Sequence, residues 1–185
     1  MQPSSYSPDL MAAYKAYAAS LGSTPKPEYP VSHGQHQVPA GYLPIRIAQF
    51  SRGDRPDGRV RLHHWAIFIP TSTRRGVGNF YEIGGSLQTG YFTQQVVNNR
   101  HPKWDKDERG SHLVGWVAPS YLGSLETHLS LVPIQQGRPD WNCQTWVVEA
   151  LRGLNQSHMY AVQTDYTQWF QQMAIVEKAW DVGDA

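Results

Sequence analysis

The residue best placed to do chemistry is Cys143, the only cysteine among 185 residues. It follows Asn142, at the point where an amphipathic helix is predicted to begin. The N–H groups and dipole of a helix N-terminus favour a thiolate and can lower a cysteine pKa from about 8.5 to roughly 3.5–7.5. We therefore interpret Cys143 as a candidate nucleophile. The alternative is a small buried apolar residue, since free cysteine is often buried.

A candidate general base lies about eighty residues upstream, in a segment with strand-like alternation at 59–70. Period-two alternation puts His64 on one face with Ala66 and Phe68, and this face is predicted to point inward. His63 falls on the opposite face and is interpreted as an exposed neighbour, although it is the alternative base. A histidine beside a thiol can accept the thiol proton and later return a proton to a leaving group.

The elements that must position these two side chains form a mixed pattern. A hairpin is predicted from strands at 43–50 and 59–70 around a turn at 54–58. Further strands are predicted at 79–84, 89–97, 111–118 and 128–134, and a polar loop at 98–110. One helix is expected to begin at 142 and another to cover 165–180.

This order of elements predicts a single α+β domain with a mostly antiparallel sheet of about five strands. The helix that carries Cys143 is expected to pack on one face of that sheet. Residues 1–41 are interpreted as an N-terminal helix followed by an irregular wrap, and residues 42–185 as the core that carries the site.

A family resemblance rests on two short segments, HWAIFI at 64–69 and NCQTW at 142–146. They resemble the signature segments of the lecithin:retinol acyltransferase-like family, which includes the HRAS-like suppressor phospholipases and acyltransferases. The resemblance implies a papain-like thiol fold of the circularly permuted NlpC-type branch, in which histidine precedes cysteine in the chain. It also implies that Cys143 attacks a carbonyl carbon to form a thioester, with His64 as general base.

The same resemblance implies a third polar group that orients the imidazole, on the strand after the histidine. The family carries a histidine there, whereas the segment 79–84 of this chain offers Glu82, with Tyr81 as the alternative. A carboxylate holds an imidazole in one orientation and raises its pKa. The expected catalytic residues are therefore Cys143, His64 and Glu82. No metal or other cofactor is expected, since the remaining histidines lack the spacing of a metal site.

The expected function is cysteine-dependent acyl transfer by a hydrolase or acyltransferase. The alternatives are a non-catalytic binding module on the same fold and a papain-like peptidase or isopeptidase. The substrate is expected to be a small-molecule or peptide acyl compound. Seven tryptophans and ten tyrosines offer aromatic surface for its recognition, and the candidate substrate-binding residues are Trp65, Tyr81 and Trp141.

Composition limits the partners. A formal net charge of +1 gives no electrostatic basis for binding nucleic acid or an anionic membrane. No apolar run approaches the ~18 residues of a transmembrane helix, and the N-terminus does not resemble a signal peptide. Membrane-acting members of the resembled family carry a C-terminal hydrophobic anchor, whereas this sequence ends in a polar segment. We therefore expect a soluble cytoplasmic protein without stable membrane anchoring.

Overall fold

The computed structural model describes residues 38–53, 62–72, 76–86, 89–157, 159–163 and 165–181. The strands in these ranges are β1 (Leu43–Phe50), β2 (His64–Pro70), β3 (Gly78–Ser86), β4 (Tyr91–Arg100), β5 (Glu108–Val117) and β6 (Ala161–Val162). The helices are α2 (Leu122–Ser130), α3 (Cys143–Gln156) and α4 (Tyr166–Asp181), with short 3₁₀ turns at Pro102–Trp104 and Pro119–Tyr121. The predicted N-terminal helix and the turn at 54–58 lie outside the described residues.

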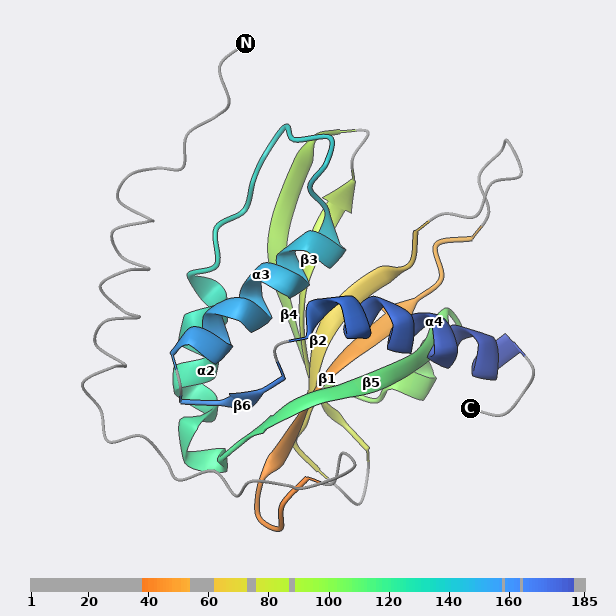
Figure 1. Cartoon of the computed structure of the whole chain (residues 1–185). Coiled ribbons are helices and arrows are strands. Elements are labelled where there is room, and N and C mark those ends of the chain that lie inside the picture. Colours follow the sequence, from red (N-terminus) through yellow and green to blue (C-terminus); the bar gives the residue numbers. More distant parts are fainter. Residues whose placement is uncertain are drawn as a thin grey trace.

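The six strands form one sheet in the order β4-β3-β2-β1-β5-β6 (Figure 1). Every strand pair is antiparallel. The α+β class and the antiparallel sheet predicted from the sequence are therefore confirmed, with β6 as a strand that was not predicted. The β1–β2 pair places Phe50 opposite His64, so the end of β1 lies beside the start of β2.

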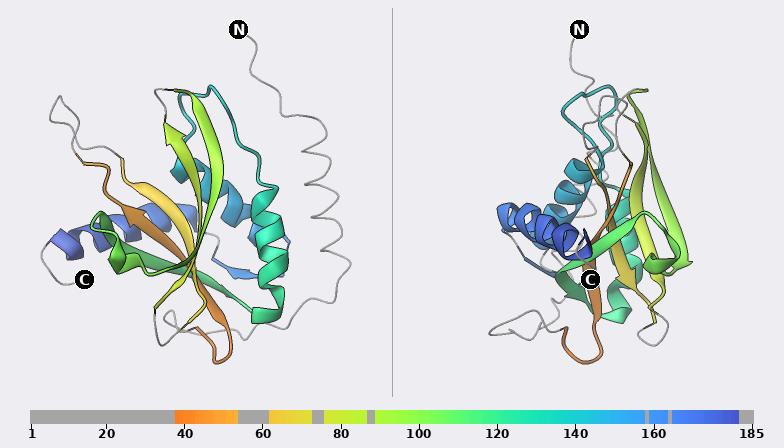
Figure 2. Two further views of the ribbon diagram at one scale, coloured as in Figure 1. Left: turned by 180° about the vertical axis from the view of Figure 1, so that it is seen from behind. Right: turned by 90° about the vertical axis from the view of Figure 1, so that its right-hand side faces the viewer.

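The helices α2, α3 and α4 cover the same face of the sheet (Figures 1 and 2). The main core forms between them and this face. Helix α3 is amphipathic, as predicted, and the buried stripe on its inner face includes Cys143, Val147, Ala150, Leu151 and Leu154. Burial of this stripe anchors the start of α3 over β2, because each buried aliphatic side chain contributes about 1.5–3 kcal/mol.

The helices pack against the face of β2 that is opposite to the face of His64. Trp65, Ile67 and Ile69 enter the main core, while Ala66 and Phe68 join a smaller cluster with Phe80 on the opposite face. Both faces of β2 are apolar in sequence, so alternation separates the faces without identifying the one that the helices cover. The face of His64 is buried, as predicted, but in this smaller cluster and not in the main core.

Two further sequence predictions need correction. Residues 122–130 form α2 where a strand was expected from 128, because Leu125 and Leu129 lie four residues apart and both enter the core. The predicted polar loop at 98–110 is shorter than expected, since β4 extends to residue 100 and β5 begins at residue 108. An ion pair of 2.5 Å between Arg100 and Asp105 closes the connection that remains.

Helix α4 is held against the sheet by two specific contacts. The buried amide of Gln49 on β1 donates to the backbone oxygens of Arg109 (3.2 Å) and Met173 (3.0 Å), and so joins β1, β5 and α4. Gly110 adopts a φ of +92°, and a Cβ at this position would overlap the side chain of Val176. A residue without a side chain is therefore needed where α4 crosses β5.

Candidate functional site

The start of α3 places Cys143 at the first helical position. Asn142 is the N-cap, and its side-chain oxygen accepts hydrogen bonds from the N–H groups of Gln144 (2.8 Å) and Thr145 (3.3 Å). This cap fixes the first turn of the helix, whose start near residue 142 was predicted from the sequence. The thiol is buried, with 3% of the residue exposed.

His64, the first residue of β2, connects the thiol to a carboxylate. Its Nε2 lies 2.7 Å from Oε2 of Glu82 on β3, and its ring is a hydrogen-bond partner of the Cys143 thiol. The structure therefore brings the three predicted catalytic residues together. Tyr81, the alternative orienting residue, points to the other face, where its hydroxyl donates to Glu126 at 2.6 Å.

The surroundings of Cys143 favour its thiolate. Burial by itself raises the pKa of the thiol, but the hydrogen bond with His64 and the positive charges of His64 and Arg52 lower it. A backbone hydrogen bond from Trp65 acts in the same direction. The net effect is a pKa below the ordinary cysteine value, which is the condition for a nucleophilic thiol at neutral pH.

The imidazole of His64 shifts in the opposite direction. Burial alone would lower its pKa, but the hydrogen bonds and negative charges of Cys143 and Glu82 raise it to about 9. A lowered thiol pKa and a raised imidazole pKa together favour a thiolate–imidazolium pair between the two values. This pair is the reactive form of a cysteine nucleophile with a histidine base.

Arg52 is a site residue that the sequence analysis did not identify. Its Nη2 lies 3.0 Å from Nδ1 of His64, and its side chain is exposed. Arg52 follows β1 by two residues, and the pairing of Phe50 with His64 brings it to the start of β2. The hairpin predicted from 43–50 and 59–70 was the signal for this contact, although only the register of the pair makes it specific.

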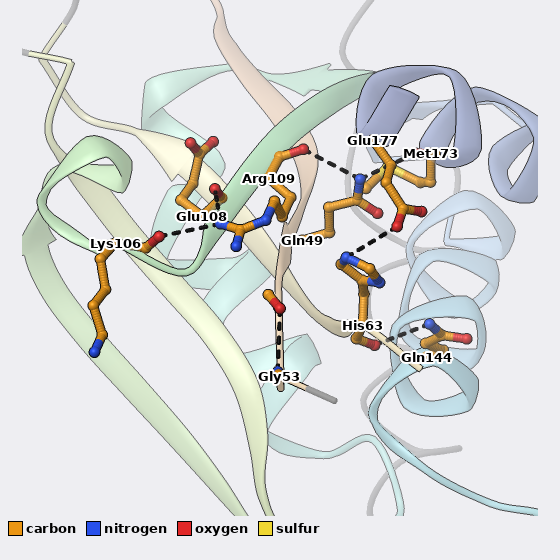
Figure 3. A network of polar contacts seen from close by, with 10 residues as sticks. Gln49, Gly53, His63, Lys106, Glu108, Arg109, Gln144, Met173 and Glu177 are labelled. Atoms are coloured by element: carbon orange, nitrogen blue, oxygen red, sulfur yellow. Dashed lines mark hydrogen bonds and ion pairs between the residues drawn. The ribbon is translucent and has the colours of Figure 1, made fainter. Parts of the chain in front are cut away.

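His63 has different partners from His64. Its Nε2 lies 3.3 Å from Oε1 of Glu177 on α4, and its backbone oxygen accepts a hydrogen bond of 3.0 Å from the side chain of Gln144 (Figure 3). These contacts attach the residue before β2 to both α3 and α4. His63 therefore helps to hold the strand that carries His64, and its ring nitrogen contacts Glu177 on α4.

Two pockets of about 290 Å³ flank the site. The first is lined by His64 and Glu82 together with Arg52, Phe50 and other residues of the open face of the sheet. The second lies between the start of β2, the start of α3 and α4, and its lining includes Leu62, His63, Trp65, Gln144, Phe170 and Glu177. A larger pocket of about 570 Å³ lies between β5 and the end of α4 and includes none of the three predicted catalytic residues.

The three aromatic residues predicted to bind substrate are all buried. Trp65 is 3% exposed, but it lines the second pocket and packs against Phe170 at a ring distance of 4.8 Å. Trp141 packs on Phe92 and donates its indole N–H to a glutamate of α3, and Tyr81 bonds to α2. Of the three, Trp65 has a position that favours a role in binding.

In the part of the chain that the structure describes, no group of three or more His, Cys, Asp or Glu side chains is arranged to hold a metal ion. None of the helices in the described ranges has the length and hydropathy needed to cross a membrane.

Comparison with known proteins gives one match. No curated protein and no solved structure matches the chain significantly. One family model matches residues 55–160, a span that includes His64, Glu82 and Cys143. That span is more than half of the 185 residues, and the chain therefore belongs to the family of unknown function DUF6540.

Proposed function

We propose that this protein is a cysteine-dependent acyl-transfer enzyme, a hydrolase or acyltransferase that works through a thioester on Cys143. The observation that carries this proposal is the chain of contacts from the Cys143 thiol to the His64 imidazole and on to the Glu82 carboxylate at 2.7 Å. Nucleophile, base and orienting group are the three roles that such chemistry needs.

The proposed first half-reaction begins with the thiolate of Cys143. Its electron pair attacks the carbonyl carbon of the substrate, and the carbonyl π electrons move to oxygen. The tetrahedral intermediate then collapses, the bond to the leaving group breaks, and the His64 imidazolium gives its proton to that group. The product is a thioester on Cys143 beside a neutral imidazole.

In the second half-reaction His64 acts as a base. It removes a proton from the acceptor, which attacks the thioester carbon while the sulfur leaves as thiolate. Water as acceptor gives hydrolysis, and an alcohol or amine gives transfer. Glu82 would hold the ring in one orientation and stabilise the imidazolium throughout.

The start of α3 would stabilise the oxyanion that forms in both steps. The side chain of Asn142 caps the N–H groups of residues 144 and 145, whereas the N–H of Cys143 is the first amide of the helix. An amide at a helix N-terminus next to the sulfur is oriented toward developing negative charge. We propose it as one oxyanion donor.

We also propose that the fold is a circularly permuted variant of the papain-like thiol fold. The resemblance of residues 64–69 and 142–146 to the lecithin:retinol acyltransferase-like signatures supports this, as do the antiparallel sheet and the packing of α3 on β2. A small or peptide acyl compound in the cytoplasm remains the proposed substrate. Either of the 290 Å³ pockets would accept part of it.

One observation favours a second candidate, a binding module in which the thiol has no catalytic role. Cys143 is 3% exposed, so little of the residue is open to a substrate. The two candidates differ in the reactivity of the thiol. An enzyme needs an accessible thiolate near neutral pH, whereas a buried structural cysteine is inert.

The first experiment measures the mass of the intact protein after exposure to iodoacetamide over a range of pH. Because Cys143 is the only cysteine, a single adduct reports on this residue alone, and Cys143→Ala is the blank. The proposal expects rapid alkylation at pH values where a free thiol is still protonated. A thiol that reacts only after unfolding would support the binding module.

The second experiment identifies the acyl-enzyme. Wild type, Cys143→Ala and Cys143→Ser are incubated with soluble esters, amides and thioesters and with phospholipid liposomes. The proposal expects an acyl adduct on wild type that neutral hydroxylamine removes, since hydroxylamine cleaves thioesters. Turnover by Cys143→Ala equal to that of wild type would overturn the mechanism. Phospholipid cleavage on bound liposomes would overturn the proposed substrate class.

A further inference from the structure

The contact of Arg52 with His64 has a consequence for the proton on the imidazole. A guanidinium has only donors, so Nδ1 of His64, 3.0 Å from Arg52 Nη2, must offer its lone pair. An ionised carboxylate has only acceptors, so Nε2, 2.7 Å from Glu82, must carry the hydrogen. Both contacts are therefore satisfied together when the ring is neutral and its lone pair is on Nδ1.

Arg52 donates to the lone pair of His64 Nδ1, and the proposed mechanism needs this same lone pair to accept the thiol proton of Cys143. Nε2 cannot accept it, because its hydrogen is bonded to Glu82. Once Nδ1 carries a proton it becomes a donor and can no longer accept from Arg52. Formation of the thiolate–imidazolium pair and release of the guanidinium are therefore linked events.

The released guanidinium would lie where a substrate binds. Arg52 is exposed and lines the pocket of about 290 Å³ that also contains His64 and Glu82. The other arginine of this pocket, Arg100, is paired with Asp105 at 2.5 Å. A guanidinium binds a planar carboxylate through two parallel hydrogen bonds, a stronger contact than one with a neutral ring nitrogen.

Building on the proposed function, we propose that Arg52 is a specificity-determining residue that binds a carboxylate of the acyl substrate, a few atoms from the reacting carbonyl. The substrate carboxylate takes the place of His64 Nδ1 as the partner of Arg52. The site would thus select anionic acyl compounds.

The test compares two alkylating reagents that differ in charge. Iodoacetate and iodoacetamide have the same reacting carbon, and in both reactions the sulfur–carbon bond forms as iodide leaves. Only iodoacetate has a carboxylate next to that carbon. The ratio of their rate constants cancels the fraction of thiolate and measures the preference for the anion. Intact mass gives both rates on Cys143 at pH 7 in wild type and variants.

Arg52→Gln is expected to lower the iodoacetate to iodoacetamide ratio by about tenfold, and Arg52→Lys by less, because an ammonium retains the charge without the bidentate geometry. Arg152→Gln is the control for net charge. Arg152 is exposed on α3, nine residues after Cys143 and about 13 Å along the helix, and its loss should leave the ratio unchanged. Asp107 lines the same pocket, so Asp107→Asn should raise the ratio.

An unchanged ratio in Arg52→Gln would overturn the role of Arg52 and leave the proposed function standing, since both reagents would still modify Cys143. An equal fall in Arg152→Gln would reduce the effect to net charge and overturn it as well. A wild-type thiol inert to both reagents would instead contradict the proposed function, and the role of Arg52 with it.

Discussion

His64 and His128 are both largely buried histidines, and the structure shifts their pKa values in opposite directions. The pKa of His64 is raised to about 9, because the hydrogen bonds and charges of Cys143 and Glu82 outweigh the effect of burial. His128 is fully buried in α2, and burial lowers its pKa to about 4. Its ring meets that of Tyr160 edge-on, at a ring distance of 6.3 Å.

The difference between the two shows what makes a buried histidine a candidate base. Burial disfavours the imidazolium at both positions, and only the anionic partners of His64 reverse that effect. A histidine held neutral down to about pH 4 is a poor acceptor for a thiol proton at pH 7, whereas a histidine with a pKa of about 9 can hold it.

The largest effect is expected from His64→Gln. Without the imidazole, the thiolate of Cys143 loses both its hydrogen-bond partner and its nearest positive charge, while the burial that opposes ionisation stays. The midpoint of the pH profile of alkylation should therefore move upward from its value in wild type. Turnover should fall by about 10²–10⁴, the typical contribution of a general acid–base.

Quenched alkylation assays at a series of pH values measure the midpoint of the pH profile, and hydrolysis of an activated ester measures turnover. In wild type, turnover should also decline as pH rises through about 9, where the His64 imidazolium loses its proton. A wild-type profile identical to that of His64→Gln would contradict the assignment.

For His128 the expected effect is on stability. The unfolded chain has a histidine pKa near 6.5 and the folded chain one of about 4, so the unfolded state binds more protons between these values. The contribution of His128 to the free energy of unfolding should be complete above pH 6.5. As the pH drops from 6.5 to 4, the free energy of unfolding should fall by about 3 kcal/mol because this contribution is lost.

Urea unfolding of wild type and His128→Leu at several pH values measures how the free energy of unfolding changes with pH in each protein. Between pH 4 and 6.5 this free energy should change less steeply in the variant than in wild type. The alkylation rate of Cys143 in the variant should match that of wild type. Parallel stability curves for the two proteins would mean that His128 does not titrate in this range.

Glu82→Gln is expected to have a smaller effect than the loss of His64. Glutamine keeps the shape and an acceptor for Nε2 but removes the negative charge that raises the His64 pKa. We expect turnover to fall by an order of magnitude or more, with the high-pH decline shifted below 9. Circular dichroism should show an unchanged fold. Unchanged kinetics would remove Glu82 from the site.

The sequence predicted this site better than it predicted the surroundings of the site. The amphipathic helix that carries Cys143 is a local feature, so residue types and spacing were sufficient to find it, whereas its N-cap at Asn142 was recognised only in the structure. The face of β2 was not predictable in the same way, because Trp65 and Phe68 are both apolar and only packing against α3 and α4 decides between the faces. His64 meets the thiol because it is the first residue of β2, near the start of α3, and not because its face points to the main core.

Contacts that depend on long-range strand register or helix crossing could not be predicted from the sequence. Arg52 approaches His64 only through the pairing of β1 with β2, and Glu177 approaches His63 only because α4 crosses that end of the sheet. Helix α2 was missed for a related reason, since the alternation in 128–134 resembles a strand until Leu125 and Leu129 are seen to share one core.

The smallest effect is expected from His63→Gln, the variant that separates adjacent histidines. His63 contacts Glu177 at 3.3 Å, and the glutamate side chain is 37% exposed. Ion pairs of this kind contribute about 0–1 kcal/mol, so stability should change by no more than that. The bond from Gln144 to the backbone oxygen of His63 survives the substitution, so the start of β2 should keep its place. Alkylation of Cys143 and ester turnover should stay within about twofold of wild type. A loss of alkylation and turnover comparable to that of His64→Gln would identify His63 as the base in place of His64.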